Sequence, residues 1–150
     1  MNDQLTQSFI YEEEAEKASY AYLMTTLIVI FGLPMPIINV IGSVFFYLAN
    51  RKKTYFVRFH CLQSMLSQLC IVPINSIALT WTLGIAFGDW TINNYYVGYI
   101  ITILAFNILE FVASIYAAVQ VRKRNDIRFW LFGPLTEMIY KPEKTQELYA

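Results

Sequence analysis

Three long stretches of this chain carry almost no charge, and they restrict what the chain can fold into. Residues 18–50 and 62–88 contain no charged side chain, and residues 95–121 contain one, Glu110. A helix of about 18 or more apolar residues can cross the roughly 30 Å hydrocarbon core of a bilayer. Only 15% of the 150 residues are charged, against about 25% in a soluble domain. We therefore expect an all-α, multi-pass integral membrane protein with one compact helical bundle.

The two ends of the chain differ from its middle. Residues 1–18 are polar and acidic, the reverse of the positive region that begins a secretory signal, so no cleavable signal is expected. Residues 129–140 are apolar and aromatic but too short to span, and Pro134 interrupts them. Such a segment suits the membrane surface. We expect three parts: an acidic polar N-terminal segment (1–18), a transmembrane helical domain (19–126), and an interfacial segment with a tail (127–150).

The first apolar region is interrupted by Pro34 and Pro36. Proline removes a backbone donor and disrupts a helix. The region is then either one long kinked span or a hairpin of two short helices that enters the membrane and returns. Irregular backbone at membrane depth is tolerated only where protein covers it, so a hairpin would have to pack against the other helices. Composition alone leaves both possibilities open.

Basic residues adjoin the spans in two places, whereas the turn at residues 88–94 contains none. The positive-inside rule places such basic segments in the cytoplasm. One long helix would then run outward from residue 56 to about residue 87, and another would return over residues 95–121. The basic side chains are predicted to follow this topology and to bind anionic lipid headgroups: Arg51, Lys52, Lys53, Arg122, Lys123, Arg124 and Arg128.

A polar stripe runs along the start of the outgoing helix. At 100° per residue, one face collects His60, Gln63, Ser64, Ser67 and Gln68. This face either lines a cavity or receives a translocating segment, or it makes hydrogen bonds between helices, which contribute about 0.6 kcal/mol each in membrane bundles. At the start of the stripe, we interpret Arg58 and His60 as an anchor at the membrane interface.

Glu110 is the one acidic residue within a span, and Asn107 and Ser114 share its helix face. An acid in a membrane is costly, and it indicates either a functional site or a structural hydrogen bond. Counted back from Arg122, Glu110 lies near the membrane midplane. Matching depth on the antiparallel helix predicts Ser67 or Gln68 as its partner.

Several classes of function lack the residues they would need. The chain has one histidine and two cysteines, with no paired carboxylates and no glycine-rich phosphate loop. These residues indicate no catalytic set, no metal site and no cofactor. We therefore expect a non-enzymatic protein whose partners are membrane lipids and other integral membrane proteins, without nucleic acid.

The basic loop and the start of the stripe resemble a known sequence pattern. Phe56-Val57-Arg58-Phe59-His60, followed by Gln63-Ser64, and the later Gly133-Pro134-Leu135 resemble small bacterial multi-pass membrane proteins of unknown function, which are similar to the Tic-twenty-like proteins of chloroplast protein import. The resemblance spans residues 19–140. It implies four helices in the bacterial inner (plasma) membrane with both termini cytoplasmic, which favours the hairpin.

Two functions follow as hypotheses. The resemblance implies an accessory subunit associated with protein translocation or membrane insertion, with a translocon as partner. The alternative is a small oligomeric channel or ion-coupled transporter that uses Glu110, Asn107 and Gln68. The partner, the substrate and the oligomeric state do not follow from the sequence.

Overall fold

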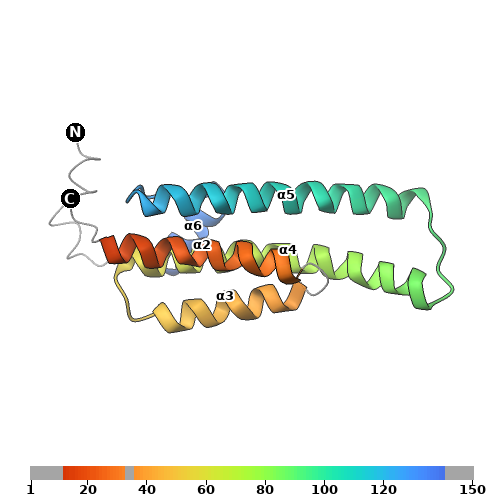
Figure 1. The fold of residues 1–150 in the computed structure, drawn as a ribbon, viewed down its shortest axis with the longest axis horizontal. Coiled ribbons are helices and arrows are strands. Elements are labelled where there is room, and N and C mark those ends of the chain that lie inside the picture. The colour runs from red at the N-terminus through yellow and green to blue at the C-terminus, as the bar shows by residue number, and fades with distance from the viewer. Residues whose placement is uncertain (1–11, 33–35, 141–150) are drawn as a thin grey trace.

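The computed structural model describes residues 12–32 and 36–140, and it is all-helical in these ranges. The expected helical fold class is therefore confirmed for this part of the chain. Two of the helices are long and apolar enough to cross a membrane, by length and composition; they run side by side along the length of the molecule (Figure 1). In chain order the helices are α2 (Glu12–Gly32), α3 (Pro36–Asn50), α4 (Tyr55–Phe87), α5 (Asn94–Arg122) and α6 (Phe132–Ile139).

The first apolar region forms two helices that pack against each other. Helix α2 ends at Gly32 and α3 begins at Pro36, a residue that suits the first helical position because no helical partner is available there for an N–H group. Figure 1 shows α2 and α3 beside one half of α4 and α5 only. At 1.5 Å per residue, the 15 residues of α3 reach about 22 Å, less than a bilayer core. The structure therefore has the hairpin, not the single kinked span.

Small side chains form the contact between α2 and α5. Ala18 and Ala21 of α2 pack in one buried cluster with Ala117, Ala118 and Val121 of α5. Alanine lets two helix backbones approach closely, and such contacts are a main source of helix association in lipid. Helix α2 also packs against α3 and α4, so it contacts three other helices.

The end of α5 turns the chain back toward the bundle. Arg124 has a φ of 66°, the left-handed conformation in which many helices end. The Asn125 amide donates to the Gln120 carbonyl at 3.0 Å, and the Arg124 amide donates to the Val121 carbonyl at 2.9 Å. These two bonds form a Schellman motif, although arginine occupies the position that usually holds glycine.

The segment after this turn enters the core. Ile127 and Phe129 pack against the buried cluster, and the Phe129 ring lies edge-on to the Tyr22 ring at 5.8 Å. Helix α6 then packs against α4. At this end of the bundle, α4 therefore contacts α2, α3, α5 and α6.

We expect Ala117→Leu to destabilise the fold, because the side chain at residue 117 is fully buried. Added methylene groups in a packed core cost about 1–3 kcal/mol, so the Tm in detergent micelles should fall. Ala105→Leu on the exposed side of α5 is the matched control. Equal Tm values for the two variants would contradict the close packing of α2 on α5.

Candidate functional site

Polar side chains, some buried and some exposed, converge at the end of the bundle that carries both basic segments. We call this end the basic end, and the opposite end, at residues 88–93, the turn end. The convergence is defined by Tyr22, His60, Gln63, Asp126 and Arg128, and we refer to it as the polar junction. Tyr22, His60 and Gln63 are fully buried. Three separate segments meet there: α2, the first turns of α4, and the connection between α5 and α6.

Gln63 is bonded through both ends of its amide. Its Nε2 donates to the Tyr22 hydroxyl at 2.8 Å and to the Ile127 carbonyl at 3.1 Å. Its Oε1 accepts from the Phe129 backbone amide at 3.2 Å. One side chain of α4 thus holds α2 and the 127–129 segment together, and it satisfies two backbone groups that lie outside regular helix.

His60 continues the network from Tyr22. The Tyr22 hydroxyl lies 3.0 Å from His60 Nδ1, and His60 Nε2 lies 3.5 Å from Asp126 Oδ1. The Tyr22 oxygen accepts from Gln63, so we assign its proton to the bond with His60 Nδ1. Nε2 then carries the imidazole proton and points to Asp126, at a separation longer than an ordinary hydrogen bond.

Asp126 ends the network with a charged group that reaches water. Its Oδ2 accepts from Arg128 Nε at 2.9 Å and from Arg128 Nη2 at 2.8 Å. Arg128 also pairs with Glu137 of α6. Burial raises the pKa of the Asp126 carboxyl, but the nearby His60 N–H and the hydrogen bonds and charge of Arg128 lower it by more, so this pKa lies below its usual value.

The remaining members of the polar stripe have different partners. Ser64 donates to the Ala21 carbonyl of α2 at 3.0 Å, whereas Ser67 donates to the Ser64 carbonyl of its own helix at 2.8 Å. Gln68 donates to Glu110 Oε1 at 2.5 Å, the contact that matching depth predicts. The stripe therefore divides between α2 and α5, and Glu110 accounts for only its last residue.

Glu110 is bonded within α5 as well, and a second polar pair lies further toward the turn end. Ser114 donates to Glu110 Oε1 at 3.0 Å. Asn75 and Asn107 donate to each other's side-chain oxygens at 3.0 and 2.9 Å. These bonds join α4 to α5 at two depths.

The aromatic and basic motif at the start of α4 packs around His60. The rings of Phe56 and Phe59 lie edge-on to the imidazole, at 4.5 and 5.5 Å, and Val57 is buried beside them. Arg58 lies over the Tyr140 ring at 5.0 Å. The His60 imidazole is enclosed by Tyr22 and by these aromatic rings, and the interface anchor stays a prediction.

The basic side chains predicted to bind headgroups fall into two groups. Arg51, Lys52, Lys53 and Lys123 are exposed, and Arg124 is half-buried at the end of α5. Arg122 pairs with Glu16 at 3.1 Å, and Arg128 belongs to the polar junction. Sequence reasoning missed Tyr22 and Asp126 as partners of the stripe; a tyrosine within an apolar stretch was the one available signal.

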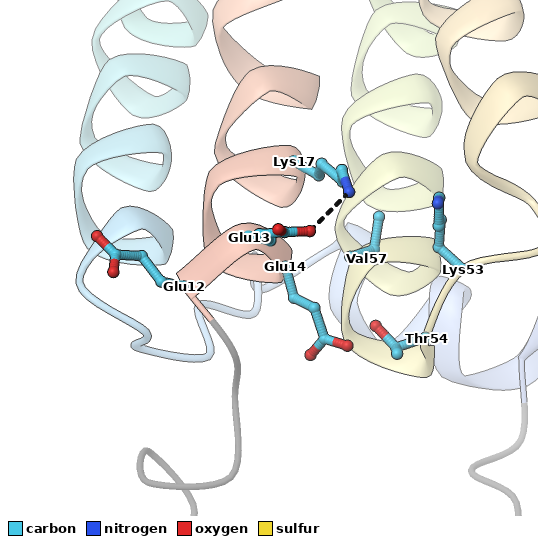
Figure 2. A pocket seen from close by; sticks show the side chains of 7 residues that line it. All are labelled: Glu12, Glu13, Glu14, Lys17, Lys53, Thr54 and Val57. Atoms are coloured by element: carbon cyan, nitrogen blue, oxygen red, sulfur yellow. Dashed lines mark hydrogen bonds and ion pairs between the residues drawn. The ribbon is translucent and has the colours of Figure 1, made fainter.

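A hollow of about 500 Å³ lies at the basic end, between the start of α2 and the start of α4. Figure 2 shows Lys17 turned toward Glu13, to which it pairs at 3.4 Å, and Glu14 directed to the side of Thr54. Its charged lining residues are three glutamates and Lys17 of α2 and Lys53 before α4. Within residues 12–32 and 36–140, no group of three or more histidine, cysteine or acidic side chains could hold a metal ion.

Comparison with known proteins assigns the chain to a family. Residues 16–136 match the model of the magnetosome magnetite crystal formation protein family, MamF/MmsF. The chain belongs to this family. The matched range runs from the first turns of α2 to the middle of α6, so it contains the whole polar junction. No curated protein and no solved structure matches the chain.

Membership in the MamF/MmsF family corrects the functional hypotheses drawn from the sequence. The resemblance to Tic-twenty-like import proteins is wrong, and so is the predicted role in protein translocation with a translocon as partner. The family match gives no support to the alternative of a channel or ion-coupled transporter either. The MamF/MmsF proteins are formation proteins of the magnetosome, and the family description names no enzymatic activity.

We expect acid to loosen the polar junction through Asp126. A carboxyl whose pKa is lower in the folded state stabilises the fold above its unfolded pKa, near 3.9 for aspartate. That stabilisation is lost as the pH falls from about 4 through the lower, folded value. Asp126→Asn should reduce the Tm at pH 7. Below pH 4, the Tm of this variant should fall less with decreasing pH than the Tm of the parent. Thermal denaturation in detergent from pH 7 to 3 measures both effects.

The matched control for this experiment is Asp89→Asn, which changes an exposed aspartate of the turn end. It should keep the parent's profile of Tm against pH. A parent and an Asp126→Asn variant with parallel profiles below pH 4 would contradict the role assigned to this carboxylate.

Proposed function

We propose that this protein is a non-enzymatic integral membrane component of the compartment in which magnetite crystals form. The observation that carries the proposal is the family match over residues 16–136. It is supported by two helices, α4 and α5, that are long and apolar enough to span a membrane. The protein contributes through its contacts with lipid and with other membrane proteins, in the membrane that encloses the crystal.

The proposed orientation places the basic end in the cytoplasm and the turn end toward the crystal. Arg51, Lys52, Lys53 and Lys123 would then lie at the cytoplasmic leaflet, where the positive-inside rule places such residues and where their exposed side chains can bind anionic headgroups. Residues 127–140 would lie near the same leaflet, with Trp130 of this segment 94% exposed.

This orientation argues for a role within the membrane and against direct contact with the mineral. Hard metal ions prefer carboxylate oxygens, and binding them firmly requires several. The turn end offers one carboxylate, Asp89, between Gly88 and Asn93. The glutamates at the start of α2 lie at the opposite end of the bundle (Figure 1). We therefore place the function in organising the membrane that surrounds the crystal.

Deletion of the gene for this protein in its magnetite-forming source cell should yield smaller or irregular crystals, while magnetite itself still forms. Electron microscopy of crystal size distributions measures this effect. Expression of the parent chain, or of Asp89→Asn, should restore the size distribution, because the Asp89 carboxylate has no part in the proposed role.

Three results would contradict the proposal. The first is an unchanged size distribution after deletion. The second is failure of Asp89→Asn to restore it while the variant is present at the parent's level, which would indicate contact with the mineral. The third is a source cell that makes the protein but no magnetite.

A further inference from the structure

A groove of about 410 Å³ lies on α4 near the turn end, away from the polar junction. It is lined by Ser76, Ile77, Thr80, Trp81 and Trp90. The α2–α3 hairpin reaches only part of the way along α4, and beyond it α4 has α5 as its neighbour (Figure 1). The groove therefore lies on the part of α4 that the hairpin leaves uncovered.

One wall of the groove is held in place by a glycine. The Trp90 indole lies so close to Gly84 that a Cβ built there would meet its Cε3 at 2.5 Å and its Cδ2 at 2.7 Å. The Trp90 ring is thereby folded back onto α4. On the other side, Trp81 packs against Tyr96 and Tyr99 of α5, with ring centroids 5.7 and 5.9 Å apart. Both tryptophan rings thus pack against neighbouring helix residues on one side, and Trp90 stays half-exposed on the other.

The chemistry of the lining favours a hydrocarbon occupant. None of the five lining residues is charged, and the Thr80 hydroxyl donates to the Ser76 carbonyl at 2.9 Å. The volume falls within the roughly 300–1,000 Å³ of ligand pockets. Tryptophan and tyrosine gather where the hydrocarbon core meets the headgroups, so the groove opens at the depth where acyl chains begin.

We propose that this groove binds one acyl chain of a membrane phospholipid, with the headgroup beside the turn at residues 88–93. Residues 76–81 cover less than two turns of α4, about 8 Å at 1.5 Å per residue. A helix from a partner protein is about 10–12 Å wide with its side chains and needs a longer contact surface. An acyl chain is narrower than a helix and is the molecule that surrounds α4 at this depth.

The three tryptophans of the chain allow a direct test. Trp130→Phe leaves only Trp81 and Trp90, which both line the groove. Phosphatidylcholine with brominated acyl chains is titrated into the purified full-length variant in detergent micelles, and tryptophan fluorescence is recorded. We expect quenching that saturates near one lipid per chain and is reversed by unbrominated phosphatidylcholine.

Two variants serve as comparisons. The double variant Trp81→Phe/Trp90→Phe retains only Trp130, which is exposed on the opposite end, and its quenching should rise in proportion to lipid without saturating. In the Trp130→Phe background, Ile77→Phe fills the groove from an exposed position and should abolish saturable quenching. Leu83→Phe, at an exposed position of α4 outside the groove, should preserve it. Far-ultraviolet circular dichroism checks that each variant is folded.

The proposal is overturned if quenching of Trp81 and Trp90 in the Trp130→Phe variant does not saturate. It is equally overturned if adding Ile77→Phe to that variant leaves the saturation unchanged. It is also overturned if light scattering shows a dimer that Ile77→Phe dissociates, because the groove would then hold a second copy of the chain.

Discussion

The fold depends on one buried amide. Gln63 of α4 binds the Tyr22 hydroxyl of α2, the Ile127 carbonyl and the Phe129 amide. The last two groups belong to a segment without regular helical bonds, and leaving a buried backbone group without a partner costs about 1–3 kcal/mol. Gln63 thus satisfies the backbone of the segment whose Phe129 ring packs against Tyr22. The same contact holds the segment that leads into α6, which itself packs against α4.

The two ends of the bundle are built differently as a consequence. At the basic end, α4 is surrounded by four helices and its polar groups are bonded to α2, to α5 and to the 127–129 segment. Toward the turn end, α4 and α5 are joined by Asn75 and Asn107 and by aromatic contacts around Trp81. The basic end contains most of the buried polar contacts, whereas the turn end has many exposed apolar side chains. The membrane-organising role proposed for this chain would use both ends.

The sequence predicted the helices well because their causes are local. Charge-free stretches, the Pro34–Pro36 interruption and the positions of basic residues are visible without a structure. The Gln68–Glu110 contact was also predictable, because antiparallel helices of known depth leave few choices. The partners of Gln63 were not predictable, because they are the Tyr22 hydroxyl on one side and backbone groups near residue 128 on the other. Nothing local indicates that an apolar segment after α5 returns to the core. The motif Phe56 to His60 led to a wrong functional inference. Its side chains pack around a buried imidazole, so the motif has a structural role in this fold. It reports how α4 begins, and a fold does not determine a function.

The most direct test of this account is a distance between two spin labels across the polar junction. Lys52→Cys and Met138→Cys, both at exposed positions, are labelled in a chain with Cys61→Ala and Cys70→Ser and measured by pulsed electron paramagnetic resonance in lipid nanodiscs. The parent should give one narrow distance distribution and Gln63→Leu a broad one, because α6 loses its attachment. Ser67→Ala, which removes only a bond within α4, should remain narrow. A narrow distribution at the parent's distance in Gln63→Leu would contradict the central role of this amide.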